Sequence, residues 1–246
     1  DEIPDLIELS DIRSDLHMHT SWSDGLNSVK EMIKTAQKIG YNFIAITDHS
    51  QSSRIANGLD STRLFSQIEQ ISDLNERIDG LDILAGSEVD ILKDGQLDFS
   101  DQVLSKLDVV VASVHSNFGM NETDMTKRLI RAIENPFVDI LGHPTGRLLM
   151  RRPEYAFNLS AVIDAAIANG VALEINASPS RLDLGSDIVK HVRDKGAMIS
   201  INTDAHSAEN LDRMWLGINV ARRGWLNKEN VINTFTINEF QEWKQR

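Results

Sequence analysis

The chain has 246 residues, of which 41% are hydrophobic and 25% charged, as in an ordinary globular protein. Its formal charge of −12 is the wrong sign for a non-specific nucleic-acid binder. It has no Cys, which excludes disulfides and thiolate metal sites and fits a cytoplasmic location. No apolar run approaches the ~20 residues that span a bilayer, and the acidic N-terminus lacks a signal core, so no membrane partner is expected.

Short apolar runs alternate with helical patterns along the chain. The first run, near residues 12–17, precedes a helix that begins at Ser28, in the capping box Ser28-Val-Lys-Glu31, and ends at Gly40. We expect further strands near residues 43–47, 83–88, 109–115, 140–143, 172–176 and 198–203. We expect further helices near residues 61–77, 123–134, 159–169 and 186–195. Two or three helices from about residue 211 to 246 should cover one end.

This alternation predicts an α/β fold with βαβ units and a parallel sheet. Seven such units without a topological break favour a closed or nearly closed TIM-like (β/α)7 barrel. We expect residues 1–246 to form a single domain, because no linker or low-complexity tract interrupts them. In such barrels the C-terminal ends of the strands carry the chemistry.

Six of the seven histidines stand at or just after the ends of these runs. His17 and His19 form an HxH pair, and alternate residues of an extended strand point to the same side, so both imidazoles can reach one ion. The other candidate donors follow later strands or the first turn. They are Asp24, His49, Glu88, His115, His143, Asp204 and His206. The seventh histidine, His191, lies within a predicted helix, and we assign it no function.

Imidazoles and carboxylates that converge on one rim predict a multinuclear metal site and hydrolytic chemistry. This donor set suits Zn, Mn or Fe. Glu88 can bridge two ions because a carboxylate offers two oxygens. Asp48 can orient a neighbouring imidazole, and Asp90 is expected outside the ligand set, near it or at the surface.

Arginines follow two of the strand ends, in GHPTGRLLMRRPEY and NASPSRLDLG. The guanidinium fork suits phosphate oxygens, so Arg147, Arg151 and Arg181 are candidates for binding a substrate phosphate. The alternative is a surface cluster of salt bridges, which Arg152 could share. No Walker loop, GxGxxG turn or GxSxG elbow is present, so nucleotide-driven transfer and serine hydrolysis are not supported.

The motifs DLHMHTSWSDG, AITDH, GSEVD, ASVHS, LGHPTGR, EINASPSRLDL and NTDAHS, in this order, resemble the polymerase-and-histidinol-phosphatase (PHP) superfamily. The similarity extends over about residues 13–225. The two arginine-containing segments are most similar to the C-terminal PHP domain of bacterial and archaeal family X DNA polymerases. The resemblance implies a distorted (β/α)7 barrel with three divalent metal ions.

The resemblance also implies three ligand sets. They are His17, His19, Glu88 and Asp204 for the first ion, Glu88, His115 and His143 for the second, and Asp24, His49 and His206 for the third. Many superfamily members have His where this chain has Asp24. The expected catalytic residues are His17, His19, Glu88, His115 and Asp204.

By the same resemblance we expect a metal-dependent phosphoesterase, most similar to a manganese-dependent 3′–5′ exonuclease that processes DNA 3′ ends. One alternative is a small-molecule phosphomonoesterase of the histidinol phosphatase kind, which the acidic charge favours. Another is a non-catalytic metal-binding module that packs against a polymerase. The chain lacks an initiator Met and a polymerase palm, which fits a processed chain or a fragment whose partner is an upstream polymerase domain.

Overall fold

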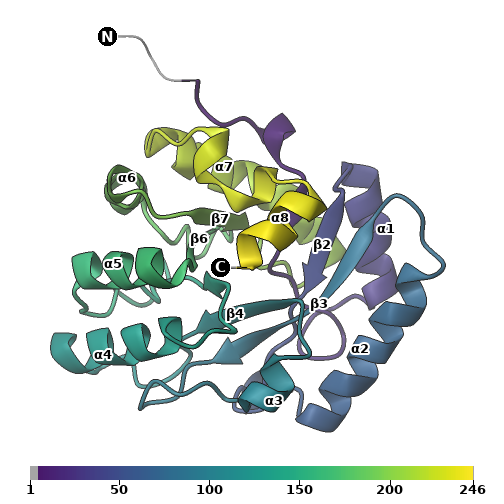
Figure 1. Ribbon diagram of the computed structural model, residues 1–246, viewed down its shortest axis with the longest axis horizontal. Coiled ribbons are helices and arrows are strands. Elements are labelled where there is room, and N and C mark those ends of the chain that lie inside the picture. The colour runs from purple at the N-terminus through teal and green to yellow at the C-terminus, as the bar shows by residue number, and fades with distance from the viewer. Residues whose placement is uncertain (1–4, 246) are drawn as a thin grey trace.

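In the computed structural model, which describes residues 5–245, seven parallel strands form the centre of the molecule (Figure 1). The strands are hydrogen-bonded to one another in chain order. They are β1 (Ser14–Asp15), β2 (Phe43–Ile46), β3 (Asp82–Asp90), β4 (Val109–Ser113), β5 (Ile140–Leu141), β6 (Ala172–Asn176) and β7 (Ile199–Asn202). The order confirms the predicted βαβ units.

The two edge strands of this sheet approach each other and nearly close it into a barrel. Just beyond their ends, Met18 and Ala205 form an isolated parallel bridge. The backbone N–H of His19 donates to the carbonyl of Ala205 at 2.8 Å, and that of Leu16 donates to Oδ1 of Asn202 at 3.1 Å. The predicted (β/α)7 barrel is therefore confirmed, with its closure made partly by side chains.

Helices connect the strands and cover the outside of the barrel (Figure 1). They are α1 (Val29–Ile39), α2 (Ser61–Asn75), α3 (Asp101–Leu104), α4 (Glu122–Ile133), α5 (Leu159–Asn169), α6 (Ser186–Lys195), α7 (Met214–Arg223) and α8 (Ile237–Lys244), with 3-10 turns η1 (Leu9–Asp11), η2 (Arg54–Ala56), η3 (Ala208–Arg213), η4 (Lys228–Asn230) and η5 (Ile232–Thr234). The predicted capping box at Ser28 and Glu31 is present, and Gly40 ends α1 with a φ of 95°. Across residues 5–245, no helix has the length and apolar character needed to cross a bilayer.

The last helix closes the barrel at the N-terminal ends of the strands. Ile232 and Phe240, from the C-terminal segment, pack against side chains at the starts of the strands. This buried cluster comprises Leu16, Phe43, Ala45, Val109, Val111, Ile140, Ala172, Ile232 and Phe240. Burying a side chain such as Phe240 stabilises the fold by about 1.5–3 kcal/mol. The prediction that the final helices cover one end is confirmed for α8, which lies across the barrel opening in Figure 1, whereas α7 packs beside α6 against β6 and β7.

Two strands have only two residues each, far fewer than the predicted runs at 12–17 and 140–143. β1 ends at Asp15 because the next backbone N–H binds the side chain of Asn202 instead of a neighbouring strand. β5 ends at Leu141, and His143 has a φ of 27°, which takes the chain out of the extended region. The short helix α3 lies where no helix was predicted. The early strand ends turn the following side chains toward the barrel mouth.

Candidate metal centre

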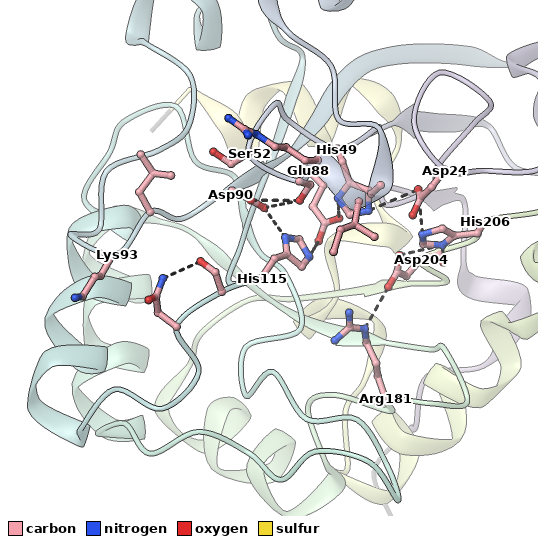
Figure 2. Close-up of a pocket in the computed structure, with 17 residues that line it drawn as sticks. Asp24, His49, Ser52, Glu88, Asp90, Lys93, His115, Arg181, Asp204 and His206 are labelled. Atoms are coloured by element: carbon pink, nitrogen blue, oxygen red, sulfur yellow. Dashed lines mark hydrogen bonds and ion pairs between the residues drawn. The ribbon is translucent and has the colours of Figure 1, made fainter.

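The predicted donors come together at the C-terminal mouth of the barrel, and Figure 2 shows part of the group. The imidazole of His19 stacks between those of His49 and His206, with ring centroids 4.3 and 4.2 Å away. The rings of His115 and His143 lie 5.2 Å apart on the other side of the cluster. Side chains at or just after the ends of six different strands therefore lie close together, as their positions in the sequence predicted.

Glu88, at the end region of β3, lies at the centre of this cluster and is buried. Each of its carboxylate oxygens faces a different set of imidazoles. The distances are 2.9 Å from Oε2 to Nδ1 of His49, 3.4 Å and 3.5 Å from Oε2 to Nε2 of His17 and His19, and 2.8 Å and 3.2 Å from Oε1 to Nε2 of His143 and His115. This geometry suits a carboxylate that bridges two ions.

Asp204 follows β7 and is the second shared carboxylate. Its Oδ1 lies 3.1 Å from Nε2 of His19 and 3.7 Å from Nε2 of His17. Its Oδ2 accepts a hydrogen bond from the side-chain amide of Asn176 at 3.0 Å. Asp204 has a φ of 52° and His143 one of 27°, conformations that cost energy for residues other than Gly. Both strained residues point a donor into the cluster.

Asp24 sits in the turn after β1, at the exposed side of the cluster. Its Oδ1 lies 3.7 Å from Nε2 of His49 and 3.5 Å from Nε2 of His206. The next position must be a glycine, Gly25, for steric reasons, because a Cβ there would lie 2.6 Å from the carbonyl oxygen of His19. The turn is thus packed directly on the backbone of the HxH pair.

Asp48 supports this turn. Its carboxylate accepts hydrogen bonds from the backbone N–H of Thr20 at 2.8 Å, from Oγ1 of Thr20 at 2.6 Å and from Oγ of Ser23 at 2.5 Å. Nε2 of Gln67 also donates to it at 2.6 Å. The interpretation that Asp48 orients an imidazole was wrong, because the hydrogen bonds of its carboxylate go to the turn that carries Asp24 and to Gln67 of α2.

The arrangement fits several metal ions. Donor atoms within each of three groups lie within 4.8 Å of one another: His17, His19 and Asp204; His49, Glu88 and His115; and His19, Asp24, His49 and His206. Donors around one ion, with bonds of ~2.0–2.2 Å, lie roughly 2.8–3.6 Å apart, close to most of the separations above. Nε2 of His17 is buried and has no hydrogen-bond partner within residues 5–245. A bound ion would satisfy that atom.

Sequence reasoning missed Glu174, a buried residue of β6 whose carboxylate contacts two of the predicted metal ligands. Its Oε1 lies 2.7 Å from Nδ1 of His17, and its Oε2 accepts the backbone N–H of His143 at 2.7 Å. Asp90 lies 2.5 Å from Nδ1 of His115, outside the ligand set. Carboxylates at Nδ1 fix the ring so that Nε2 can bind an ion.

The pKa values of two imidazoles and of the central carboxylate favour the forms that bind metal. Burial lowers the pKa of His19 to about 3, assisted by the imidazoles of His49 and His206. Burial likewise lowers the pKa of His143 to about 4. Burial acts to raise the pKa of Glu88, but the surrounding imidazoles, His115 foremost, hold it well below its ordinary value. Two neutral imidazoles and an ionised carboxylate therefore meet at neutral pH. For three other imidazoles burial acts to lower the pKa, but neighbouring carboxylates raise that of His17 well above its ordinary value, that of His115 to about 10 and that of His206 to about 9, so an ion would have to displace protons there.

The arginines have separate locations. Arg181 lies in the mouth, with Nε 3.5 Å from Oδ2 of Asp204. Arg147 donates to the carbonyl of Arg181 at 2.9 Å and pairs with Glu154 at 3.0 Å. Arg151 lines a separate groove of about 440 Å³ formed by residues 147–154. Arg181 is thus placed beside the donors, while phosphate binding by Arg147 and Arg151 stays a prediction.

A cleft of about 670 Å³ opens over the cluster (Figure 2). At one end it is lined by Asp24, His49, Glu88, His115, Arg181, Asp204 and His206. From there it extends across residues 52–56, 92–93 and 116–117, in the loops that follow β2, β3 and β4. Its size is that of a site for a small molecule or part of a polymer.

A family model described as PHP domain matches residues 15–178. The chain is 45% identical, over 98% of its length, to the Bacillus subtilis (strain 168) protein named DNA polymerase/3′-5′ exonuclease PolX, of which it spans only 42%. It is 33% identical to a protein named probable phosphatase from Thermoanaerobacter sp. (strain X514), covering 94% of this chain and 95% of that protein.

Among solved structures, histidinol phosphate phosphatase from Lactococcus lactis, complexed with Zn, L-histidinol and phosphate, matches with a TM-score of 0.60 and 20% identity. The match covers 86% of this chain and 92% of that chain. At this level of identity the likeness concerns the fold, and it agrees with the nearly closed barrel described above.

Proposed function

The chain belongs to the PHP domain family, and on this premise we propose that it is a metal-dependent phosphoesterase that removes nucleotides from the 3′ ends of DNA. The observation that carries the proposal is Glu88, whose two oxygens face separate groups of imidazoles at the barrel mouth. DNA is favoured as the substrate by the 45% identity to the Bacillus protein named as a 3′-5′ exonuclease.

We propose three ion sites with the ligand sets inferred from the family. They are His17, His19, Glu88 and Asp204; Glu88, His115 and His143; and Asp24, His49 and His206. Support comes from the separations between donor atoms within these sets, which run from 2.8 to 3.7 Å where they are measured. Imidazole and carboxylate donors suit Zn, Mn or Fe.

Clustered divalent ions, when bound, lower the pKa of a coordinated water and neutralise the non-bridging oxygens of a phosphate. The chain supplies the orientation for this chemistry. Glu174 and Asp90 hold the rings of His17 and His115 by their Nδ1 atoms. The guanidinium of Arg181 stands at the mouth and is the group that we propose contacts the scissile phosphate.

The test is hydrolysis of a 5′-labelled single-stranded oligonucleotide by the metal-loaded protein with added Mn²⁺. We expect stepwise shortening from the 3′ end by the wild type and at least a roughly hundredfold loss of rate in His17→Ala, since metal ions supply several kcal/mol of transition-state stabilisation. His191→Ala is the matched control, because His191 is exposed on α6. Equal rates for wild type and His17→Ala would contradict the proposal.

A small-molecule phosphomonoesterase is the second candidate function. It is favoured by the match to nearly the full length of the protein named probable phosphatase, and by the net charge of −12, which repels DNA. Turnover of a small phosphate monoester well above that of an oligonucleotide would select this function. Metal-loaded protein that hydrolyses neither substrate would support the non-catalytic module instead.

A further inference from the structure

The cleft continues beyond the donors into a distal arm, which we define as the part lined by residues 52–56, 92–93 and 116–117. These residues belong to loops that follow β2, β3 and β4, whereas Arg181 follows β6. In Figure 2, Lys93 lies on the other side of His115 from Arg181 and Asp204. The cluster of donors therefore separates two cationic ends of one cleft.

Two exposed cations, Arg54 and Lys93, line the distal arm. Within residues 5–245, neither has a carboxylate within ion-pair distance. The nearby acids have other partners. Asp90 faces His115 and Ser53, Asp94 pairs with Arg131, and Asp98 accepts from Ser52. In a chain of net charge −12, this arm thus offers two positive charges that the protein leaves available for an anion.

The loop that carries Arg54 is held in place from several sides. Oγ of Ser53 donates to Asp90, at 3.1 Å to Oδ1 and 3.2 Å to Oδ2, and Asp90 also contacts His115. Arg63 donates to the carbonyls of Asn57 at 2.9 Å and of Gly58 at 3.2 Å. The loop is therefore preorganised, so that binding a ligand there costs little conformational entropy.

The opposite wall is fixed by one buried arginine. Arg128, only 1% exposed, donates Nε to the carbonyl of Leu92 and a terminal nitrogen to that of Ser116, each at 2.9 Å. It also donates to the carbonyl of Ile91. One guanidinium thus ties together the loops that carry Lys93 and Asn117. Next to Arg54, Ile55 is fully exposed at the rim, where its side chain is free to contact a ligand.

We propose that the distal arm is a second phosphate subsite for a polynucleotide strand. Arg54 and Lys93 bind the phosphate next to the scissile one, and Ile55 contacts the intervening sugar or base. This inference rests on the proposed function and adds to it the means of recognising a strand. A phosphomonoester has one phosphate, which ions held by the donors at the barrel mouth would bind, and it leaves the arm empty.

The test compares two diesters with metal-loaded protein: a short oligothymidylate, and thymidine 5′-(p-nitrophenyl phosphate), which lacks a flanking phosphate. In Arg54→Gln/Lys93→Gln, we expect the ratio of kcat/KM for the oligothymidylate to that for the single-nucleoside diester to fall about tenfold. The slope of log kcat/KM against log salt for the oligothymidylate should become shallower by about 0.7, because one neutralised phosphate of a single strand contributes about that much. Lys30→Gln/Lys34→Gln, exposed on α1, removes the same charge elsewhere and should change neither quantity.

The possible failures can be told apart. Wild type that hydrolyses both substrates, with an unchanged ratio and salt slope in Arg54→Gln/Lys93→Gln, would overturn the subsite and leave the proposed function standing. An equal loss on both substrates would also overturn the subsite, because it would mean damage to the metal centre. Wild type that hydrolyses neither diester would overturn the proposed function itself, and the subsite with it.

Discussion

Oε1 of Glu174 lies 2.7 Å from Nδ1 of His17, and both side chains are fully buried. Because this carboxylate holds Nδ1, Nε2 of the same ring faces Glu88 and Asp204, where it could bind an ion that displaces its proton. Oε2 of the same carboxylate accepts the backbone N–H of His143. One side chain of β6, a strand that supplies none of the nine predicted donors, therefore orients donors that follow two other strands.

Glu174→Gln is expected to weaken metal binding by roughly 10- to 100-fold while the barrel still folds. The amide of Gln cannot provide the same charged acceptor to both His17 and His143. The measurement is competition with a chelator of known affinity, read by metal analysis. Glu69→Gln, exposed on α2, is the control. Equal affinities in the two variants would show that Glu174 does not tune the site.

Glu88→Gln is expected to remove the shared bridge. Gln has one carbonyl oxygen in place of two anionic ones, so the metal content per chain should fall, and phosphoester hydrolysis should fall at least roughly a hundredfold. Elemental analysis of the purified variant beside wild type measures the first effect. A variant that keeps the wild-type number of ions would argue against a bridging role.

Gly25→Ala is expected to displace the turn that carries Asp24. The added Cβ would meet backbone atoms of His19 and Thr20 at 2.6 Å, and such overpacking costs roughly 1–3 kcal/mol of unfolding free energy. Urea unfolding measures it. Gly119→Ala is the matched control, since no atom lies within 4 Å of its added Cβ, and it should change stability by less than about 0.5 kcal/mol. Equal stabilities of the two variants would refute the packing argument.

Asp183 should give the protein a pH-dependent stability. Burial raises the pKa of Asp183 to about 7, although hydrogen bonds from Thr145 and the charge of Arg147 oppose the shift. Its ordinary value is 3.8, so the folded state holds an extra proton between about pH 4 and 7. The contribution of Asp183 to the free energy of unfolding is fully present below this pH range and is lost as the pH rises through it.

The variant Asp183→Asn lacks this titration but keeps an acceptor for the backbone N–H of Thr145. The unfolding free energy of the variant relative to wild type should therefore increase from pH 5 to pH 7, with a slope of up to roughly 1.4 kcal/mol per pH unit. Urea unfolding of both proteins across this range, at constant metal concentration, measures the difference. Parallel pH profiles would contradict the assignment.

The number and order of the barrel strands could be predicted because buried parallel strands are continuous apolar runs in the sequence. β2, β4 and β6 lie within the predicted runs, and the donors that follow β2 and β4 are brought to one rim because parallel strands end together. The sequence also contained an unused indication of Glu174. A charge between Leu173 and Ile175 is costly in a buried strand unless it is paired, and it is paired with His17.

The arginines show what could not be predicted. Arg147 closely follows His143, yet its guanidinium binds the carbonyls of Arg181 and Leu182, which lie in the loop after β6. Strand periodicity does not fix the direction of a long side chain in a loop, because distant backbone acceptors decide it. The early end of β1 could not be predicted for a similar reason, because a side chain of β7 accepts the backbone N–H of Leu16.

Phe240 and Ile232 occupy the barrel base, and β7 delivers Asp204 and His206 to its mouth. All four residues come after residue 178, where the match to the family model stops. A truncation designed on that boundary would expose apolar side chains at the base and remove two donors at the mouth. A stable barrel that holds all nine predicted donors therefore requires the polypeptide to continue into α8, which carries Phe240.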